Sequence, residues 1–555
     1  MGNYINLAKN RPLTIFVVGG VMSGVGKGVA TASIAALLKE CDLNVTTMKI
    51  DPYINVDAGT INPIEHGEVF VTHDGLESDQ DLGNYERFLN QDISRVNYMT
   101  TGQVYQTVIN NERALKYNGK TVEAVPDIPL EVIRRIKEAQ KINEADITLV
   151  EIGGTLGEYQ NVLFLEAARM MKRDNPNDVL MILVSYLPVP SALGEMKTKP
   201  TQAAIKLMNE TGLFPDLVIA RSTHVIDNLR KEKLSRSCGL KPEDIIAAPD
   251  VKSIYSVPSE FKKQNVAKRI LDKFGLDDSC SQDTRWDKMK EIVEKKRDNK
   301  IRIGVVGKYF STGDFVLSDV YLCVLEALKH ASWFLDVDLD VQWINSEEIE
   351  QNEDKIDSLL SGLNGVIVPG GFGVRGIEGK LKTIQYAREN DIPYLGLCYG
   401  MQLAIIETAR NVLHLKDANT TEIDKNCQNP VIHLMNEQEE KMKNENYGGT
   451  MRLGVFPCKL KEGSKVKSIY NKDLINERHR HRYEVNLDYK DVLEKEGGLL
   501  FSGFSPDKKL MEVIERPAHR FFVATQFHPE FLSRPFKPHP LFVAFLKRGL
   551  DSVDN

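Results

Sequence analysis

Short apolar runs rich in β-branched residues alternate with longer segments of helical period along the first half of the chain. This alternation restricts the fold more than any other feature of the sequence. The runs lie at residues 14–18, 44–50, 147–152, 179–184 and 217–220, with helical patterns such as 29–40 and 130–145 between them. Strands that alternate with helices favour a parallel sheet covered on both faces. The predicted fold class is therefore α/β.

The pattern changes near residue 280. Residues 276–300 become polar and charged, which is typical of a solvated helix or linker. A new apolar run begins at 301–306, and further candidate strands follow at 365–368, 393–397 and 522–527. We expect two doubly wound domains, 1–280 and 301–555, joined by a linker at 281–300. The charged segment 436–446 is expected to be a surface excursion of the second domain.

Composition excludes several classes of protein. The net charge of −7 argues against broad binding to nucleic acid or to an anionic membrane surface. No stretch of the sequence approaches the roughly 18 apolar residues of a membrane span. The seven cysteines are scattered and form no CxxC pair, which argues against a disulfide framework or a spaced zinc site. These observations predict a cytoplasmic protein with reduced cysteines.

A glycine-rich loop follows the first predicted strand. Residues 19–28 read GGVMSGVGKG and lead into a helical pattern. Glycines let backbone N–H groups approach phosphates, and Lys27 can reach their terminal oxygens. The loop departs from a strict Walker A motif, because five residues separate Gly20 from Gly26 and Gly28 replaces the usual Ser or Thr. A tight turn with a surface lysine is the less favoured interpretation.

The missing hydroxyl means that carboxylates elsewhere must hold Mg²⁺, which prefers oxygen ligands alongside phosphate. The candidates are Asp81, in the run DQDLG, and Glu151, at the carboxyl end of a predicted strand. Ligands gather at that end of an open α/β sheet. Lys49 ends another strand and offers a second cation. For any one of these charges alone, a structural ion pair is an equally good explanation.

The second half contains the pattern of an activated nucleophile. Residues 393–402 read PYLGLCYGMQ, a strand that breaks at a Gly-x-Cys-x-Gly turn and continues into a helix. The flanking glycines permit the strained turn that exposes Cys398, and the helix start favours its thiolate. His528 and Glu530, in the run QFHPE, supply a base and a group that orients it. The backbone N–H groups of PGGFG at 369–373 suit an oxyanion hole.

Cys398, His528 and Glu530 in these settings resemble the class I glutamine amidotransferases, and the N-terminal half resembles the CTP synthase family. The segments that carry the resemblance are 19–28, 49–57, 65–71, 83–88, 151–155, 197–202, 396–400, 448–454, 477–485 and 528–530. They span nearly the whole chain. The resemblance implies a P-loop-like synthetase domain followed by a class I glutamine amidotransferase domain.

The family converts UTP to CTP: ATP phosphorylates the uracil O4, and ammonia from glutamine then displaces that phosphate. For ATP the resemblance implies Ser23, Gly24, Val25, Gly26, Lys27, Gly28 and Asp81, with Lys27 and Lys49 on the transferring phosphoryl group. For Mg²⁺ it implies Asp81 and Glu151. For UTP or feedback CTP it implies Ser23, Glu158, Tyr159, Gln160, Lys197, Thr198, Lys199, Gln202 and Lys233.

The remaining implied roles belong to the second half. For glutamine they are Gly371, Cys398, Gln402, Glu422 and Arg480, with Gly371 also in the oxyanion hole. GTP is the family's activator, and its lid region would contain Phe372, Arg375, Arg452 and the segment 448–454. The resemblance also implies a homotetramer, with filament formation left open.

Several positions depart from the family's usual pattern: His73, Glu123, Asp127, Glu158, Tyr159, Gln160 and Tyr399. Glu123 and Asp127 add negative charge where the family binds pyrimidine nucleotide. Altered feedback inhibition is the favoured explanation, and a related amidotransferase that acts on a modified uracil nucleotide is the alternative. A scaffold with dead sites is disfavoured, because Lys27, Cys398, His528 and Glu530 are all present.

Overall fold

The computed structural model describes residues 11–61, 67–191, 194–277, 280, 284–307, 311–312, 315–316, 318–371, 373, 375–434 and 451–551. The charged segment 436–446 lies outside these residues. The chain forms two compact units: unit 1 is Met1–Asp57 with Asn84–Lys295, and unit 2 is Ala58–Gly83 with Lys296–Asn555. The segment Ala58–Gly83 therefore precedes most of unit 1 in sequence but makes its contacts within unit 2.

Unit 1 is built on a seven-stranded, wholly parallel sheet in the order β5-β2-β6-β1-β7-β8-β9. Its strands are β1 (Leu13–Gly19), β2 (Val45–Asp51), β5 (Tyr98–Thr100), β6 (Ile147–Ile152), β7 (Val179–Tyr186), β8 (Leu217–Ser222) and β9 (Ile245–Pro249). The predicted α/β class is confirmed. Strands β5 and β9 were not predicted, because they are short and carry little alternation.

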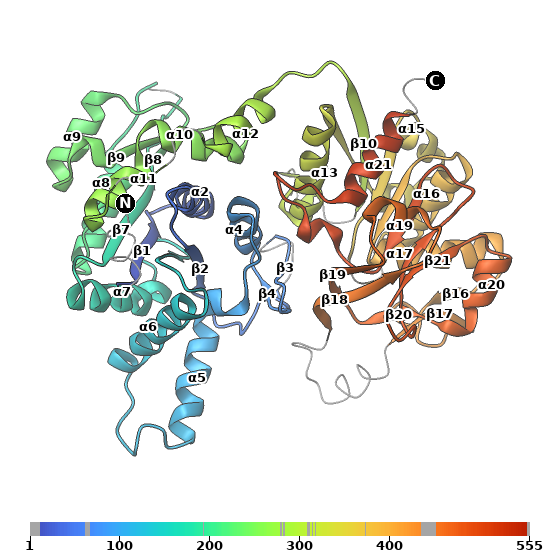
Figure 1. Cartoon of the computed structure of the whole chain (residues 1–555), viewed down its shortest axis with the longest axis horizontal. Coiled ribbons are helices and arrows are strands. Elements are labelled where there is room, and N and C mark those ends of the chain that lie inside the picture. Colours follow the sequence, from blue (N-terminus) through green and yellow to red (C-terminus); the bar gives the residue numbers. More distant parts are fainter. Residues whose placement is uncertain are drawn as a thin grey trace. The chain divides into compact units, whose positions relative to one another are not determined.

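Helices cover both faces of this sheet (Figure 1). On one face α2 (Lys27–Lys39) packs with α10 (Val257–Lys263) and α11 (Val266–Phe274). On the other, α6 (Ala124–Ile142) packs with α5 (Thr101–Arg113) and α7 (Val162–Asp174). The stripe Ile128, Val132 and Ile136 of α6 is buried at helical spacing, as an amphipathic helix requires. The remaining helices are α4 (Asp81–Leu89), α8 (Lys199–Glu210), α9 (Asn228–Cys238) and α12 (Arg285–Glu294).

The predicted linker contains a packed helix. Trp286 of α12 is fully buried and stacks on Phe88 at 5.1 Å between ring centroids. This aromatic contact ties the charged helix to unit 1, so the solvated interpretation holds for only one of its faces.

Two cysteines contradict the expectation that all seven are reduced. Cys41 follows α2 and is joined by a disulfide to Cys280, 239 residues later. Cys238, Cys323, Cys398, Cys427 and Cys458 are free. The pairing could not be derived from spacing, because it depends on how α11 and the following segment return to α2.

Unit 2 contains a nine-stranded mixed sheet in the order β13-β10-β14-β15-β23-β22-β21-β18-β19. The strands from β13 to β23 in that order are parallel, and the others are antiparallel. Their bounds are β10 (Lys300–Gly307), β13 (Asp338–Asn345), β14 (Gly365–Val368), β15 (Tyr394–Leu397), β18 (Arg452–Leu460), β19 (Leu474–His481), β21 (Leu500–Phe504), β22 (Met511–Glu515) and β23 (Phe522–Thr525).

Helices also cover both faces of this sheet. One core joins α13 (Leu322–Leu335) to α21 (Pro540–Leu550), and the other joins α16 (Ile377–Glu389) to α17 (Tyr399–Glu407). A separate three-stranded sheet is formed by β16 (Ala418–Thr420), β17 (Asn429–Leu434) and β20 (Tyr483–Val485). Within Ala58–Gly83, β3 (Phe70–Val71) and β4 (Glu77–Ser78) pair as an antiparallel hairpin.

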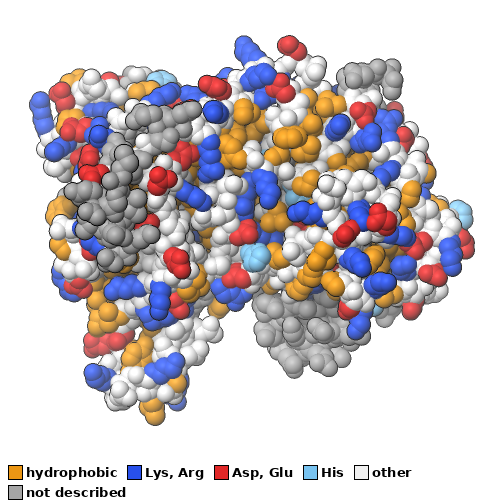
Figure 2. All heavy atoms as spheres, in the orientation of Figure 1, with side chains coloured by type: hydrophobic (Ala, Val, Ile, Leu, Met, Phe, Trp, Pro, Cys, Tyr) orange, Lys and Arg blue, Asp and Glu red, His pale blue; other side chains and the backbone are white. Residues whose placement is uncertain are grey.

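Lys and Arg side chains are interspersed with Asp and Glu over the face drawn in Figure 2. Among the described residues, no helix is both long and apolar enough to span a bilayer.

Candidate active sites

Cys398 occupies a sharp turn between β15 and α17. Its φ of 50° and ψ of −98° lie outside the regions that ordinary residues prefer, and its N–H donates to the Thr525 carbonyl at 2.7 Å. Strained backbone of this kind clusters at functional sites. The turn places the sulfur at the start of α17, where unsatisfied N–H groups favour negative charge.

The glycines on either side of Cys398 are required by close packing. A Cβ on Gly400 would lie 2.1 Å from the Val368 carbonyl oxygen, and one on Gly396 would lie 2.8 Å from Ala524 Cβ. Both distances are far below van der Waals contact. The Gly-x-Cys-x-Gly pattern therefore reflects how tightly α17 is set against β14 and β23.

His528 and Glu530 follow β23, which is the neighbour of β15 in the sheet. His528 Nδ1 lies 2.7 Å from Glu530 Oε1, and both side chains are buried. Burial lowers the pKa of His528, but Glu530 and Cys398 outweigh it and raise that pKa to about 10. Glu530 therefore stabilises the protonated form of the ring, which suits His528 to act as a general base. The three predicted residues are thus brought together in one site.

Further groups surround the thiol. Cys398 Sγ donates to the Arg480 carbonyl at 3.7 Å, and Gln526 Nε2 donates to Cys398 Sγ at 3.6 Å. Gln402 Nε2 in turn donates to Gln526 Oε1 at 3.2 Å and to the Tyr483 carbonyl at 3.0 Å. Gln402 therefore reaches the nucleophile through Gln526, a residue that the sequence did not single out.

The glycine-rich turn after β14 lies beside the triad. A Cβ on Gly370 would be 3.0 Å from His528 Cε1 and 3.7 Å from Cys398 Cβ, so a side chain there would intrude between them. Gly371 is the next residue, at the position expected for the oxyanion hole. Glu422, which was predicted to bind glutamine, accepts a hydrogen bond from the Gly373 N–H at 3.0 Å. This bond connects the turn to the predicted glutamine-binding residues. Phe372 lies outside the described residues.

Arg480 and Arg482 have different surroundings. The Nε of Arg480 donates to Glu77 Oε1 at 2.8 Å, so its side chain is held by the β3–β4 hairpin. Burial raises the pKa of Tyr483; Glu422 raises it further, and Arg482 lowers it. Glu422 and Arg482 therefore act on the same hydroxyl. Residues 478–482 read RHRHR, a pattern that does not distinguish one arginine from another. The sequence therefore did not identify Arg482 as a candidate glutamine-binding residue.

The predicted lid residues are only partly described. Arg375 Nη2 donates to Glu347 Oε2 at 3.0 Å on an exposed surface. Arg452 is partly buried, with Nη1 2.7 Å from Glu512 Oε1 and its guanidinium above the Phe456 ring. Residues 448–450 lie outside the described part of the chain.

The glycine-rich loop joins β1 to α2 as predicted. Gly24 and Gly26 have φ values of +69° and +82°, which other residues adopt only with strain, and Gly26 is the N-cap residue that precedes α2. Lys27 Nζ donates to the Gly154 carbonyl at 2.6 Å, across the mouth of the loop. Ser23 is exposed. Backbone N–H groups at a helix start of this kind suit an anion.

Lys49 and Glu151 lie side by side at the carboxyl ends of β2 and β6. Lys49 Nζ is 3.1 Å from Glu151 Oε1 and 3.7 Å from Asp51 Oδ1. Tyr85 donates a hydrogen bond to Glu151 Oε2. Asp81 is the first residue of α4 and is partly buried. Among the described residues, no group of three or more His, Cys, Asp or Glu could hold a metal by itself.

The predicted pyrimidine residues lie on two parts of unit 1. Lys197, Thr198, Lys199 and Gln202 surround the start of α8, and Lys233 lies on α9. Lys197 Nζ is 2.6 Å from Glu195 Oε2. Glu158 accepts hydrogen bonds from the Thr155 N–H at 2.9 Å and from Gln160 Nε2 at 2.6 Å, so neighbouring neutral donors stabilise its carboxylate. Asp127 similarly accepts from the Glu123 N–H at 2.7 Å, and Tyr159 is 94% exposed.

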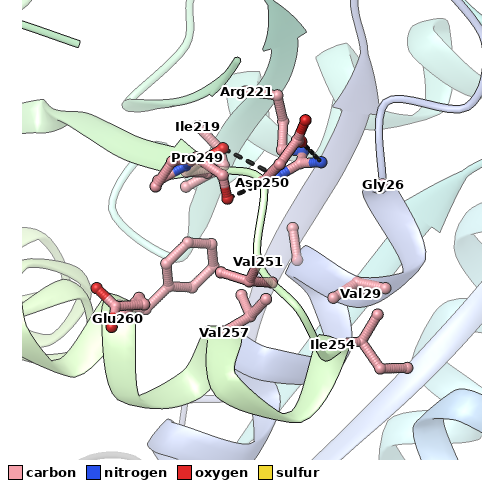
Figure 3. Close-up of a pocket in the computed structure, with 13 residues that line it drawn as sticks. Gly26, Val29, Ile219, Arg221, Pro249, Asp250, Val251, Ile254, Val257 and Glu260 are labelled. Carbon is pink, nitrogen blue, oxygen red and sulfur yellow. Dashed lines mark hydrogen bonds and ion pairs between the residues drawn. The ribbon is translucent and has the colours of Figure 1, made fainter. Parts of the chain in front are cut away.

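An unpredicted pocket adjoins the glycine-rich loop (Figure 3). Gly26 and Val29 line one side, while Ile219, Val251 and Phe261 contribute apolar walls. Arg221 Nη1 donates to the Ala248 carbonyl at 2.9 Å, and Nη2 donates to Asp250 Oδ1 at 2.9 Å. Arg221 and Asp250 lie at the carboxyl ends of β8 and β9. That position was the available signal, since ligands bind at this edge.

Comparisons with known proteins cover nearly the whole chain. A family model described as CTP synthase N-terminus matches residues 14–276, and one described as glutamine amidotransferase class-I matches residues 316–548. The curated CTP synthase of Prochlorococcus marinus (strain NATL1A) is 47% identical over 95% of this chain and 93% of its own. That of Shouchella clausii (strain KSM-K16) is 45% identical over 97% and 98%. The solved glutaminase domain of Trypanosoma brucei CTPS with bound acivicin is 39% identical, covers 45% of this chain and 94% of its own, and has a TM-score of 0.42.

Proposed function

The chain belongs to the CTP synthase family, whose substrates are UTP, ATP and glutamine, and on that premise we propose how its residues divide the reaction. Cys398, His528 and Glu530 hydrolyse glutamine, and the sites around the glycine-rich loop phosphorylate and aminate UTP. The observation that carries the first half is the contact of His528 with Glu530 beside a strained cysteine. The second half is supported by Lys27, Lys49 and Glu151 at one sheet edge.

In the glutaminase reaction the Cys398 sulfur attacks the side-chain carbonyl carbon of glutamine. His528 takes the thiol proton and returns it to the departing nitrogen, so the C–N bond breaks and ammonia leaves. Water, deprotonated by His528, then cleaves the thioester to release glutamate and restore the thiol. The Gly371 N–H stabilises the tetrahedral oxyanion. Glu422 offers a negative charge for the α-amino group of glutamine, and Arg482 offers a positive charge for its α-carboxylate. Arg480 was predicted to bind glutamine, but its side chain pairs with Glu77.

In the synthetase reaction the phosphates of ATP bind the 19–28 loop, and its base enters the pocket beside Gly26. The apolar walls of that pocket suit a planar ring, and Arg221 with Asp250 supply polar contacts. Lys27 and Lys49 neutralise charge on the transferring phosphoryl group, mainly by position. Lys197, Lys199 and Lys233 are the cations assigned to the UTP triphosphate. Ammonia then displaces phosphate from C4 of the pyrimidine.

Of the two carboxylates predicted for Mg²⁺, Glu151 belongs to unit 1, where it is buried beside Lys49 and Tyr85. Asp81 belongs to the segment Ala58–Gly83 of unit 2 and is assigned by the family resemblance alone. Mg²⁺ is usually held by one or two carboxylates together with substrate phosphates, so a set of three protein ligands is not needed. The ion would supply charge neutralisation on the phosphates of ATP.

The family resemblance also supports GTP activation, CTP feedback, a homotetramer and a cytoplasmic location. Arg375 pairs with Glu347 but its side chain is 64% exposed, whereas the side chain of Arg452 is only 9% exposed and pairs with Glu512, so Arg375 is the better candidate to contact GTP. The Cys41–Cys280 disulfide is the one observation that weighs against the cytoplasmic location, because disulfides are rare in the reducing cytosol.

The test supplies UTP, ATP, Mg²⁺ and glutamine and measures CTP. Absence of CTP with both glutamine and ammonium would refute the proposed synthetase function. Cys398→Ala should lose glutamine-dependent synthesis and keep ammonia-dependent synthesis. Loss of both activities in that folded variant would contradict the division of labour.

A further inference from the structure

The β3–β4 hairpin packs against β19, the strand whose residues contact the nucleophile and its base. Both strands of the hairpin belong to Ala58–Gly83, which packs within unit 2 although the chain continues from both its ends into unit 1. On the hairpin, the Val71 carbonyl accepts from Arg478 Nη1 at 3.0 Å, and Glu77 Oε1 accepts from Arg480 Nε at 2.8 Å. These arginines alternate along β19, so their side chains share the face against which the hairpin packs.

The same two arginines contact the triad through their backbone. The Arg480 carbonyl accepts the hydrogen bond from Cys398 Sγ at 3.7 Å, and the Arg478 carbonyl accepts from the His528 N–H at 2.8 Å. A shift of β19 along or across the sheet would therefore move the hydrogen-bond partners of the nucleophile and of its base together.

A set of aromatic contacts also connects the hairpin to the triad. Phe70 of the hairpin meets Phe531 edge to face at 5.3 Å, and Phe531 stacks on the His528 ring at 5.0 Å with 15° between the planes. The tip of the hairpin also contacts β18: the His73 carbonyl accepts from the Val455 N–H at 3.0 Å. A Cβ on Gly75 would lie 2.8 Å from the Leu453 carbonyl oxygen, and one on Gly454 would lie 2.7 Å from the Gly75 nitrogen.

Glu77 is the charged group of this contact. Its side chain is 2% exposed and that of Arg480 is 12% exposed, and Gly59 leaves the room that the Glu77 carboxylate occupies. An ion pair this well shielded from water is sensitive to the loss of either partner. A pair at the surface would contribute little.

We propose that Glu77 is a positioning residue for glutamine hydrolysis: it fixes Arg480 and β19 so that the thiol of Cys398 and the ring of His528 keep their reactive geometry. The proposal rests on the assigned role of Cys398. The segment Ala58–Gly83, which interrupts unit 1 in sequence, thereby contributes directly to the competence of the glutaminase.

Glu77→Gln keeps the shape of the side chain and removes its charge. We expect the kcat for glutamine hydrolysis to fall at least about 10-fold, because small displacements of reacting groups have large effects on rate. The KM for glutamine and the ammonia-dependent synthesis of CTP should change less than about 3-fold. Unchanged kcat would overturn the proposal, and so would a change confined to KM, which would make Arg480 a direct ligand of glutamine.

Glu68→Gln is the matched control. Glu68 lies in the same segment and accepts from the Cys323 N–H at 2.7 Å, away from β19. Its kcat should match the wild type; an equal fall in both variants would show a general loss of packing and refute a specific role for Glu77.

Two further measurements cover the case in which Glu77→Gln does not fold. Glu77→Asp keeps the charge but lengthens the contact with Arg480, and its kcat should be intermediate; a wild-type kcat would refute the proposal. In the folded variants the rate at which iodoacetamide alkylates Cys398, followed by peptide mass spectrometry, should change in parallel with kcat. Cys398→Ala in the same assay tests the proposed nucleophile separately from the proposed role of Glu77. If Cys398→Ala still hydrolyses glutamine, Cys398 is not the nucleophile. If Cys398→Ala is inactive while Glu77→Gln is fully active, only the role of Glu77 is refuted.

Discussion

Glu530 is predicted to supply much of the basicity of His528. Glu530→Gln removes the negative charge 2.7 Å from Nδ1 while keeping the size of the side chain. The pKa of His528, raised from 6.5 to about 10, represents roughly 5 kcal/mol in favour of the imidazolium at 1.36 kcal/mol per pH unit. Glu530 and Cys398 both contribute to this shift. Because a correctly positioned and charged general base typically contributes about 10²–10⁴-fold to a rate, Glu530→Gln should slow glutamine hydrolysis at least about 10²-fold.

The pH dependence of the same variant follows from the sign of the pKa change. The folded-state pKa of His528 lies above its ordinary value, so the stability it contributes is fully present below about pH 6.5 and is lost as the pH rises toward about 10. In Glu530→Gln the folded-state pKa is lower, so that loss should still begin near pH 6.5 but be complete at a lower pH and be smaller.

The assay is steady-state release of glutamate from glutamine, with ammonia-dependent CTP synthesis as the internal control. Glu462→Gln, a carboxylate with an 87% exposed side chain in unit 2, is the matched variant and should behave as wild type. A Glu530→Gln enzyme within about 3-fold of the wild-type kcat would refute the reasoning, because a base that works without its carboxylate is not oriented or charged by it.

Three further predictions concern other parts of the molecule. Lys27→Ala should lower both glutamine- and ammonia-dependent CTP synthesis by at least about 10²-fold and leave glutamate release intact, because its amine reaches over the phosphate loop; normal CTP synthesis would contradict this assignment. Gly400→Ala should destabilise unit 2 by about 1–3 kcal/mol or more in urea unfolding, since its Cβ would overlap the Val368 carbonyl, and an unchanged midpoint would argue against the close packing of α17. Thiol titration of the denatured, unreduced protein should find five free cysteines, and a count of seven would exclude the Cys41–Cys280 bond.

The local parts of both sites could be predicted from the sequence. The turn at Cys398, the run of His528 to Glu530 and the loop at 19–28 are set by short-range geometry: glycines at fixed spacing, a strand before and a helix after. The α/β class could be predicted for the same reason, because β-branched runs and helical periods can be recognised within windows of about 5 to 15 residues.

Other features depend on contacts between distant residues. Glu77 and Arg480 are 403 positions apart, and Cys41 and Cys280 are 239 apart, so no spacing rule could pair them. The pocket of Arg221 and Asp250 forms only where β8 and β9 end beside the start of α2. The run at 478–482 shows the division most clearly. Its sequence predicts a strand near the glutamine site. Only the tertiary structure pairs Arg480 with the buried Glu77 and leaves Arg482, with Glu422, to influence Tyr483. The physical reason is that the surface packed against a charged side chain decides whether that charge is buried.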